Sequence, residues 1–160
     1  MRVVIADTTP LRYLAEIDHL GVVPQLFQTV YIPSAVYEEL QRPSTPEQVR
    51  RQLSNPPAWL EIVTETSTSD PGLLALHPGE RAAIALGVAM RADLIVIDER
   101  KGTAAAVERG FETTGTLGVL LLAAERGLID LEAAFNRLRA TTFRHTEAML
   151  TTLLAKHKKA

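Results

Sequence analysis

Short apolar runs alternate along this chain with longer segments in which apolar residues recur every three or four positions. The runs at 3–6 and 94–98 are continuous and rich in β-branched residues, which is typical of strands buried on both faces. Strands that alternate with helices indicate βαβ units, so we expect an α/β fold with a mainly parallel central sheet covered on both sides. The other predicted strands are 29–32, 60–64 and 112–114. The predicted helices are 10–20, 24–28, a third helix opened by Pro33, 46–53, 79–91, 101–109, 117–126, 130–138 and 146–156, with polar loops at 42–45, 54–57 and 66–71.

No internal repeat, low-complexity tract or linker interrupts this pattern, so we expect a single domain over residues 1–160. The C-terminal helices, about 130–157, end in an apolar stripe that contains Met149, Leu150, Leu153 and Leu154. A helix at the end of a small domain packs either on its own core or on a second copy of the chain. The stripe by itself leaves both options open.

Composition narrows the class of protein. The 160 residues contain no cysteine, which excludes a disulfide framework, a thiol nucleophile and a Cys-ligated zinc. No signal peptide or membrane-spanning run is evident, so we expect a cytoplasmic protein with no membrane partner. A net charge of −2 argues against a general electrostatic nucleic-acid binder, and aromatic residues at 5% provide no base-stacking platform. The basic residues of the tail form either a solvated helix surface or a local face for a polyanion: Arg137, Arg139, Arg144, Lys156, Lys158 and Lys159.

Two aspartates lie at the ends of the two most strand-like runs. Asp7 follows 3–6, and Asp98 closes 94–98. The carboxyl ends of parallel strands meet at one edge of a sheet, where open α/β folds place their sites. Like charges held close together repel, so a carboxylate cluster needs a cation, and oxygen-only ligands favour Mg²⁺ or Mn²⁺. The competing interpretation is that each aspartate caps the helix or turn that follows it.

Two glutamates are placed to face the same edge. On the third predicted helix, Glu39 flanks the apolar stripe of Val36 and Leu40, whereas Glu38 lies almost opposite that stripe. Glu80 opens a helix that is apolar nearly all round and therefore predicted to be buried. The alternative for Glu39 is a solvated side chain at the rim. The alternative for Glu80 is a favourable interaction with the helix dipole alone.

Two further patterns carry weaker signals. The Gly- and Thr-rich segment 114–118 can begin a helix that holds a phosphate on its free backbone N–H groups. It lacks the full spacing of a phosphate-binding loop, so a tight structural turn is the favoured interpretation. The four histidines are scattered without metal-ligand spacing, and we interpret them as structural or exposed: His19, His77, His145 and His157.

Five segments taken together resemble the PIN domain, and most closely its small prokaryotic branch. They are 5–11 (IADTTPL), 32–40 (IPSAVYEEL), 76–86 (LHPGERAAIAL), 94–102 (LIVIDERKG) and 114–121 (TGTLGVLL). The resemblance implies a three-layer α/β/α sandwich. It also implies a carboxylate pocket that binds one or two Mg²⁺ or Mn²⁺ ions and cuts single-stranded or structured RNA.

The resemblance also assigns roles to individual residues. Asp7 and Asp98 match the family's acids at the ends of the first and fourth strands, and Glu39 matches the acid that precedes a helical Leu. Glu80 opens the central helix where the family more usually has Asp, and Glu99 is an additional ligand. The residues expected to contact substrate are Thr8, Arg100, Lys101 and Thr116. This branch resembles the toxin ribonucleases of toxin–antitoxin pairs, which implies an antitoxin partner and a homodimer.

The sequence therefore favours a metal-dependent endoribonuclease, and two alternatives remain. The first is a catalytically inactive PIN-fold module that binds RNA or protein through the same groove. Retention of all four acids argues against it. The second is a metal-dependent phosphatase, which would normally need a second Asp two residues after the first, where this chain has Thr9.

Overall fold

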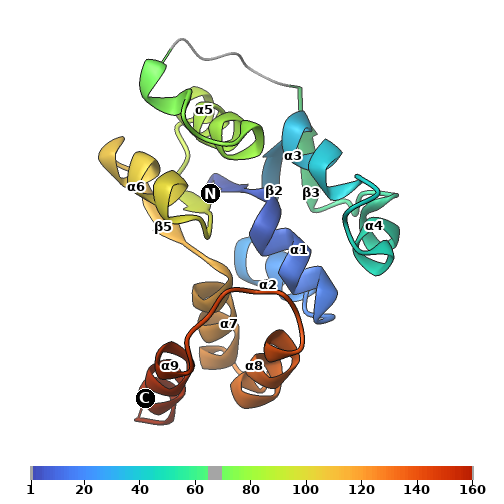
Figure 1. The fold of residues 1–160 in the computed structure, drawn as a ribbon, viewed down its shortest axis with the longest axis vertical. Coiled ribbons are helices and arrows are strands. Elements are labelled where there is room, and N and C mark those ends of the chain that lie inside the picture. Colours follow the sequence, from blue (N-terminus) through green and yellow to red (C-terminus); the bar gives the residue numbers. More distant parts are fainter. Residues whose placement is uncertain (1, 65–69, 160) are drawn as a thin grey trace.

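The computed structural model describes residues 2–64 and 70–159, and it is built around a five-stranded sheet whose neighbouring strands are all parallel (Figure 1). Across the sheet the strands lie in the order β3-β2-β1-β4-β5. The predicted α/β fold with a parallel sheet is therefore confirmed. The loop expected at 66–71 falls largely outside the described residues. The strands are β1 (Val4–Ala6), β2 (Val30–Pro33), β3 (Leu60–Val63), β4 (Leu94–Val96) and β5 (Glu112–Thr114).

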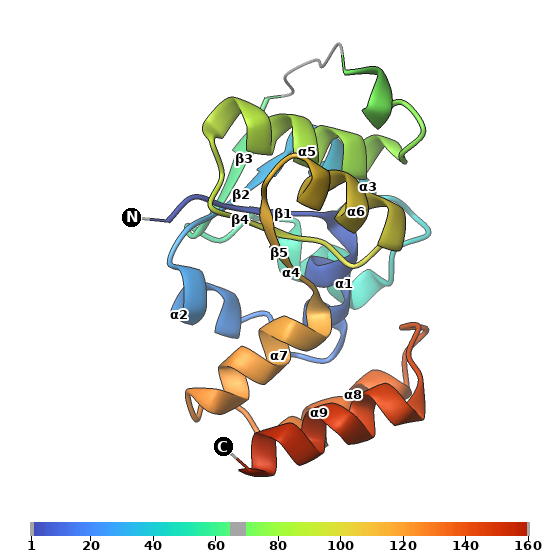
Figure 2. The same cartoon turned by 90° about the vertical axis from the view of Figure 1, so that its left-hand side faces the viewer.

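Each face of the sheet buries its own apolar core, which gives the architecture three layers. Side chains alternate along β1, so that Val4 and Ala6 contribute to one core and Ile5 contributes to the other. The Ile5 core is covered by α5 (Pro78–Met90), α6 (Arg100–Glu108) and the 3-10 helix η1 (Pro71–Leu73). The larger core on the Val4 side takes residues from α1 (Thr8–Glu16), α2 (Val22–Phe27), α3 (Ser34–Leu40), α4 (Glu47–Leu53) and α7 (Thr116–Glu125). Figure 2 shows α5 and α6 on one side of the sheet and α2 and α7 on the other.

The C-terminal helices α8 (Leu131–Arg139) and α9 (Glu147–Lys159) extend the larger core. α9 contacts both α7 and α8, and Leu150 is completely buried among residues of its own chain. Met149, on the same helix, is 46% exposed. None of the described helices is long and apolar enough to cross a membrane.

The first helix differs from its predicted bounds in a way that bears on Asp7. α1 begins at Thr8 instead of residue 10, so that Asp7 occupies the N-cap position, but its side chain makes no capping hydrogen bond. The capping interpretation of Asp7 is therefore wrong, and its carboxylate is available for another role. α1 ends at Glu16 because Asp18 adopts a φ of 61°, a left-handed conformation that interrupts the helical path.

The fourth strand is shorter than predicted. β4 ends at Val96, although Ile97 still donates a backbone hydrogen bond of 2.7 Å to Thr114. The N-cap residue of α6 is Glu99, so Asp98 does not cap this helix. Its carboxylate instead turns toward the start of α7, with consequences for the site described below.

Candidate functional site

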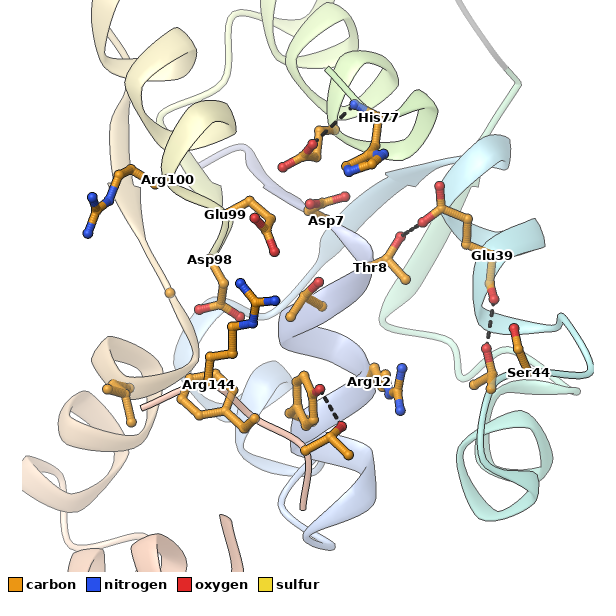
Figure 3. A pocket seen from close by; sticks show the side chains of 18 of the residues that line it. Asp7, Thr8, Arg12, Glu39, Ser44, His77, Asp98, Glu99, Arg100 and Arg144 are labelled. Atoms are coloured by element: carbon orange, nitrogen blue, oxygen red, sulfur yellow. Dashed lines mark hydrogen bonds between the residues drawn. The ribbon is translucent and has the colours of Figure 1, made fainter. Parts of the chain in front are cut away.

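The carboxyl edge of the sheet opens into a cavity of about 830 Å³ (Figure 3). β1 and β4 pair in register from Val4 to Ala6, and Asp7 donates its backbone N–H to Val96 at 2.9 Å. This pairing brings the two strand ends side by side. All five acids considered at the sequence level line the cavity: Asp7, Glu39, Glu80, Asp98 and Glu99.

Glu39 is fixed in place by two donors from different elements. Thr8 donates its hydroxyl to Oε2 at 2.6 Å, and Gly79 donates its backbone N–H to Oε1 at 3.1 Å. A Cβ atom on residue 79 would lie 2.6 Å from the same carboxylate, so the start of α5 needs glycine to come this close. Glu38 is exposed. The orientation predicted from the helical periodicity is confirmed: Glu39 faces the sheet edge and Glu38 faces water.

Asp98 is held by a single residue at the start of α7. Thr116 donates its backbone N–H to Oδ1 at 2.7 Å and its hydroxyl to Oδ2 at 2.6 Å. Gly115 permits this approach, because a Cβ atom there would collide with Oδ1. The Gly- and Thr-rich turn therefore uses its free N–H group on a carboxylate within the chain.

Of the five acids that line the cavity, Asp7 and Glu80 each have a buried oxygen without a hydrogen-bond partner among the described residues. Asp7 is 2% exposed and Glu80 is 5% exposed. Asp7 Oδ1 and Glu80 Oε2 are buried, and neither has a hydrogen-bond partner among the described residues. The other oxygen of Glu80 accepts the backbone N–H of His77 at 3.2 Å. An unpartnered, buried carboxylate oxygen costs free energy, which a bound cation would offset.

The electrostatics of the cavity raise the pKa of three of its acids, Asp7, Glu80 and Asp98. Burial raises the pKa of Asp7 to about 7, against a lowering contribution from the Thr8 backbone, and the charges of Glu80, Glu39 and Asp98 add to the rise. Burial also raises the pKa of Glu80 and of Asp98. The charge of Glu99 raises both pKa values further. A hydrogen bond from His77 lowers the pKa of Glu80, and hydrogen bonds from Thr116 lower the pKa of Asp98. These carboxylates are therefore electrostatically coupled.

The donor set fits a hydrated Mg²⁺ or Mn²⁺ ion. Among the described residues, no three acidic or histidine side chains lie together closely enough to form a ready-made metal site. Mg²⁺, however, usually keeps several waters and takes only one or two protein carboxylates directly. Asp7 and Glu80 each offer one buried oxygen with no other partner, so they could supply the one or two carboxylate ligands that a hydrated Mg²⁺ ion takes.

The expected substrate-contacting residues are placed differently from one another. Arg100 lines the cavity, whereas Lys101 is exposed and does not. Thr8 lines the cavity with its hydroxyl committed to Glu39, and the hydroxyl of Thr116 is committed to Asp98.

The sequence indicated only part of the basic side of the cavity, namely Arg100 and, within the basic tail, Arg144. Arg12, Arg42 and Arg144 line it together with the acids, and so does His77. Arg12 lies one helical turn after Thr8, a spacing that could have indicated a shared face. The sequence included Arg144 in the basic tail but gave no sign that it lines this cavity, because the connection between α8 and α9 reaches the cavity only through tertiary packing.

The other arginines of the basic tail are used elsewhere. Arg137 donates to the backbone of Ile17 at 3.0 Å and lies 3.9 Å from Asp18. Arg139 forms an ion pair with Glu147 at 3.1 Å. Of the tail residues considered for a polyanion, Arg144 is the one that the structure places at the cavity.

Comparison with known proteins gives one match. A family model described as a PIN domain matches residues 3–159, which is nearly the whole chain. No curated protein and no solved structure matches the chain.

Proposed function

Because the chain belongs to the PIN-domain family, whose members are generally nucleases that use divalent metals, we propose that it is a metal-dependent endoribonuclease. The observation that carries this proposal is the pair of buried, unpartnered oxygens of Asp7 and Glu80 at the carboxyl edge of the sheet. A structural carboxylate would have found a partner within the fold. These two are arranged for a ligand that the chain itself does not supply.

Each acid has a distinct part in this proposal. Asp7 and Glu80 would hold Mg²⁺ or Mn²⁺, and the bound ion would polarise the scissile phosphate and lower the pKa of an attacking water. Asp98 and Glu39 are held in fixed orientations by Thr116 and by Thr8 with Gly79, so they can orient waters around the ion without moving. Glu99 adds negative charge at the rim of the same cavity.

The test is a nuclease assay on a mixture of structured and single-stranded RNAs, with Mn²⁺, with Mg²⁺ and with chelator. We expect cleavage at internal positions that depends on the metal and stops with chelator. RNA that is bound but never cut, in either metal, would contradict the catalytic proposal and favour the inactive RNA-binding module.

We further propose that the protein acts as the toxin of a toxin–antitoxin pair and forms a homodimer, as its resemblance to the small prokaryotic branch implies. Induced expression should then arrest growth, and co-expression of a neighbouring antitoxin should relieve the arrest. Light scattering at micromolar concentration should give about twice the chain mass. A monomer throughout that range would rule out the dimer and leave the nuclease proposal intact.

A further inference from the structure

The cavity extends well beyond the acids. Six waters around a metal ion occupy roughly 180 Å³, at about 30 Å³ for each water. The cavity measures about 830 Å³, so most of it is free for something other than a hydrated ion. The side away from Glu39 is formed by the connection between α8 and α9, the start of α7 and the start of α9. We call this surface the C-terminal wall, and it consists of Leu117, Gly118, Thr142, Phe143, Arg144 and Met149.

The C-terminal wall is held in place by contacts with α1. The hydroxyl groups of Tyr13 and Thr142 are hydrogen-bonded at 2.8 Å, and the Tyr13 and Phe143 rings meet edge to face with their centroids 5.2 Å apart. The backbone N–H of Phe143 is also donated to the Thr141 hydroxyl at 3.1 Å. The residues that precede Arg144 are thus held in place, which restricts where its side chain begins. A binding surface arranged in advance loses less entropy when a ligand arrives.

Arg144 projects from this wall into the cavity (Figure 3). Within the described part of the chain, its guanidinium makes neither a hydrogen bond nor an ion pair. Other arginines of the C-terminal region are engaged: Arg137 binds Ile17 and Arg139 binds Glu147. A free guanidinium presents a planar set of donors that matches the oxygens of a phosphate. Its position in a cavity that also contains acids suits a ligand with both a metal-binding and a phosphate group.

The same wall also has an apolar part. Leu117 and Met149 line the cavity, and Met149 keeps 46% of its surface exposed although it is large and apolar. Methionine sulfur makes favourable contacts with the edges of aromatic rings. An unpaired nucleobase is a flat aromatic surface of this kind. A base within a duplex would not be free to enter, so the wall suits a single-stranded segment.

We propose that the C-terminal wall is a nucleotide subsite that binds single-stranded RNA beside the scissile phosphate. Arg144 binds a backbone phosphate of the neighbouring nucleotide, and Met149 with Leu117 receives its base. The proposal rests on the proposed nuclease function for the identity of the ligand. It goes further by assigning recognition to the start of α7, to α9 and to the connection between α8 and α9, which contain none of the five cavity acids.

Binding measured without metal separates this subsite from catalysis. We would titrate a short fluorescently labelled single-stranded RNA with protein in chelator, where no cleavage is expected. Arg144→Gln should weaken binding on the order of tenfold and lower the slope of log affinity against log salt by about 0.7. The matched control is Arg126→Gln, which removes the same charge from an exposed arginine outside the cavity and should change binding less than twofold. Arg144→Lys keeps the charge but loses the planar donors, so it should fall between the two.

The base contact is tested with a series of RNAs that each lack one base. In the wild type, removal of one particular base should weaken binding about fivefold, and the same removal should have no further effect in Met149→Ala. Leu128→Ala, an equally small change at an exposed apolar residue away from the cavity, should retain the wild-type response. Equal binding by Arg144→Gln and Arg126→Gln, or an identical base-removal profile in wild type and Met149→Ala, would overturn the subsite. Cleavage with Mn²⁺ is scored separately, so a protein that binds RNA through Arg144 but never cuts it would refute only the nuclease proposal.

Discussion

Asp7 and Asp98 close neighbouring strands of one sheet, yet the fold treats them in opposite ways. Asp98 has a donor on each oxygen, both from Thr116. Asp7 is more deeply buried, and its Oδ1 has no partner among the described residues. Burial raises the pKa of both acids; hydrogen bonds from Thr116 oppose the rise at Asp98, and one from the Thr8 backbone opposes it at Asp7, whose pKa still reaches about 7. Two residues of the same type, at equivalent ends of adjacent strands, therefore differ in how fully their carboxylates are hydrogen-bonded.

The difference shows which acid depends on a cation. An aspartate whose ionised form is hydrogen-bonded can remain charged and fixed in the empty protein. Asp7 has one buried oxygen without a donor and a pKa of about 7, so a bound cation would strongly favour its ionised form. Under the proposed function, Asp98 is a carboxylate whose orientation is fixed before a metal binds, and Asp7 is the acid whose ionisation would be coupled to metal binding.

The largest effect is expected from removal of either carboxylate charge. Asp7→Asn should abolish both Mn²⁺ binding and RNA cleavage, because it replaces the unpartnered ligand oxygen with a neutral amide. Asp98→Asn should also abolish cleavage. Asp98→Asn should lose less Mn²⁺ affinity than Asp7→Asn if Asp98 contacts the ion only through bound waters. Calorimetric titration with Mn²⁺ measures this difference, and unchanged affinity in both variants would refute the site.

The next largest effect is expected in how the free energy of unfolding depends on pH, which should differ between variants of Asp7 and of Asp98. The pKa of Asp7 is about 7 in the folded protein, against 3.8 for an unperturbed aspartate, so between these pH values the folded state binds a proton that the unfolded state does not. From this group alone, the free energy of unfolding of the metal-free protein should then be highest below pH 3.8 and fall by about 4 kcal/mol in total as the pH rises through 7. The contribution of Asp7 should level off about one pH unit above its folded pKa.

Urea unfolding in chelator across this pH range tests the expectation. In Asp7→Asn the free energy of unfolding should fall much less over this pH range, and the variant should be more stable than wild type at pH 7, because it carries no buried charge. Asp98→Asn should show most of the wild-type fall in the free energy of unfolding. Parallel profiles for wild type and Asp7→Asn would show that Asp7 is not the residue that titrates.

The sequence could indicate the two aspartates but not the difference between them. A continuous β-branched run followed by Asp predicts a strand-end carboxylate, because parallel strands end at one edge. The partner of Asp98 lies after the next helix and strand, at Thr116, and the Gly115 that admits it is equally typical of an ordinary turn. The free guanidinium of Arg144 depends on how α8 and α9 pack against α7 and α1. Local periodicity carries no information about such contacts, whereas it did predict the phase of Glu39 from Val36 and Leu40.

A smaller effect is expected from the support beneath Asp98. Thr116 is fully buried, and Thr116→Val keeps its shape while it removes the hydroxyl that donates to Oδ2. The pKa of Asp98 should rise, because that hydrogen bond lowers it. Mn²⁺ affinity should fall by roughly tenfold at most, because Thr116 orients a carboxylate that would contact the ion through waters. Thr116→Ser retains the hydroxyl and should behave like wild type. Equal affinities for the Val and Ser variants would show that the backbone N–H alone holds Asp98.

The smallest effect is expected from substitution of the two neighbouring glutamates of α3, Glu38 and Glu39. Glu39 accepts hydrogen bonds from Thr8 and Gly79, so Glu39→Gln would direct an amide N–H₂ group at one of these two donors. Such a mismatch typically costs about 1–3 kcal/mol, and it would also displace α5, which carries Glu80. We expect cleavage to fall roughly tenfold with the fold retained. Glu38→Gln changes the charge by the same amount at an exposed position and should leave cleavage within twofold. Rates measured side by side with Mn²⁺ give the result. Equal losses of cleavage in the two variants would mean that negative charge near the cavity matters more than the hydrogen bonds by which Glu39 joins α1, α3 and α5. Glu39 would then contribute only its charge.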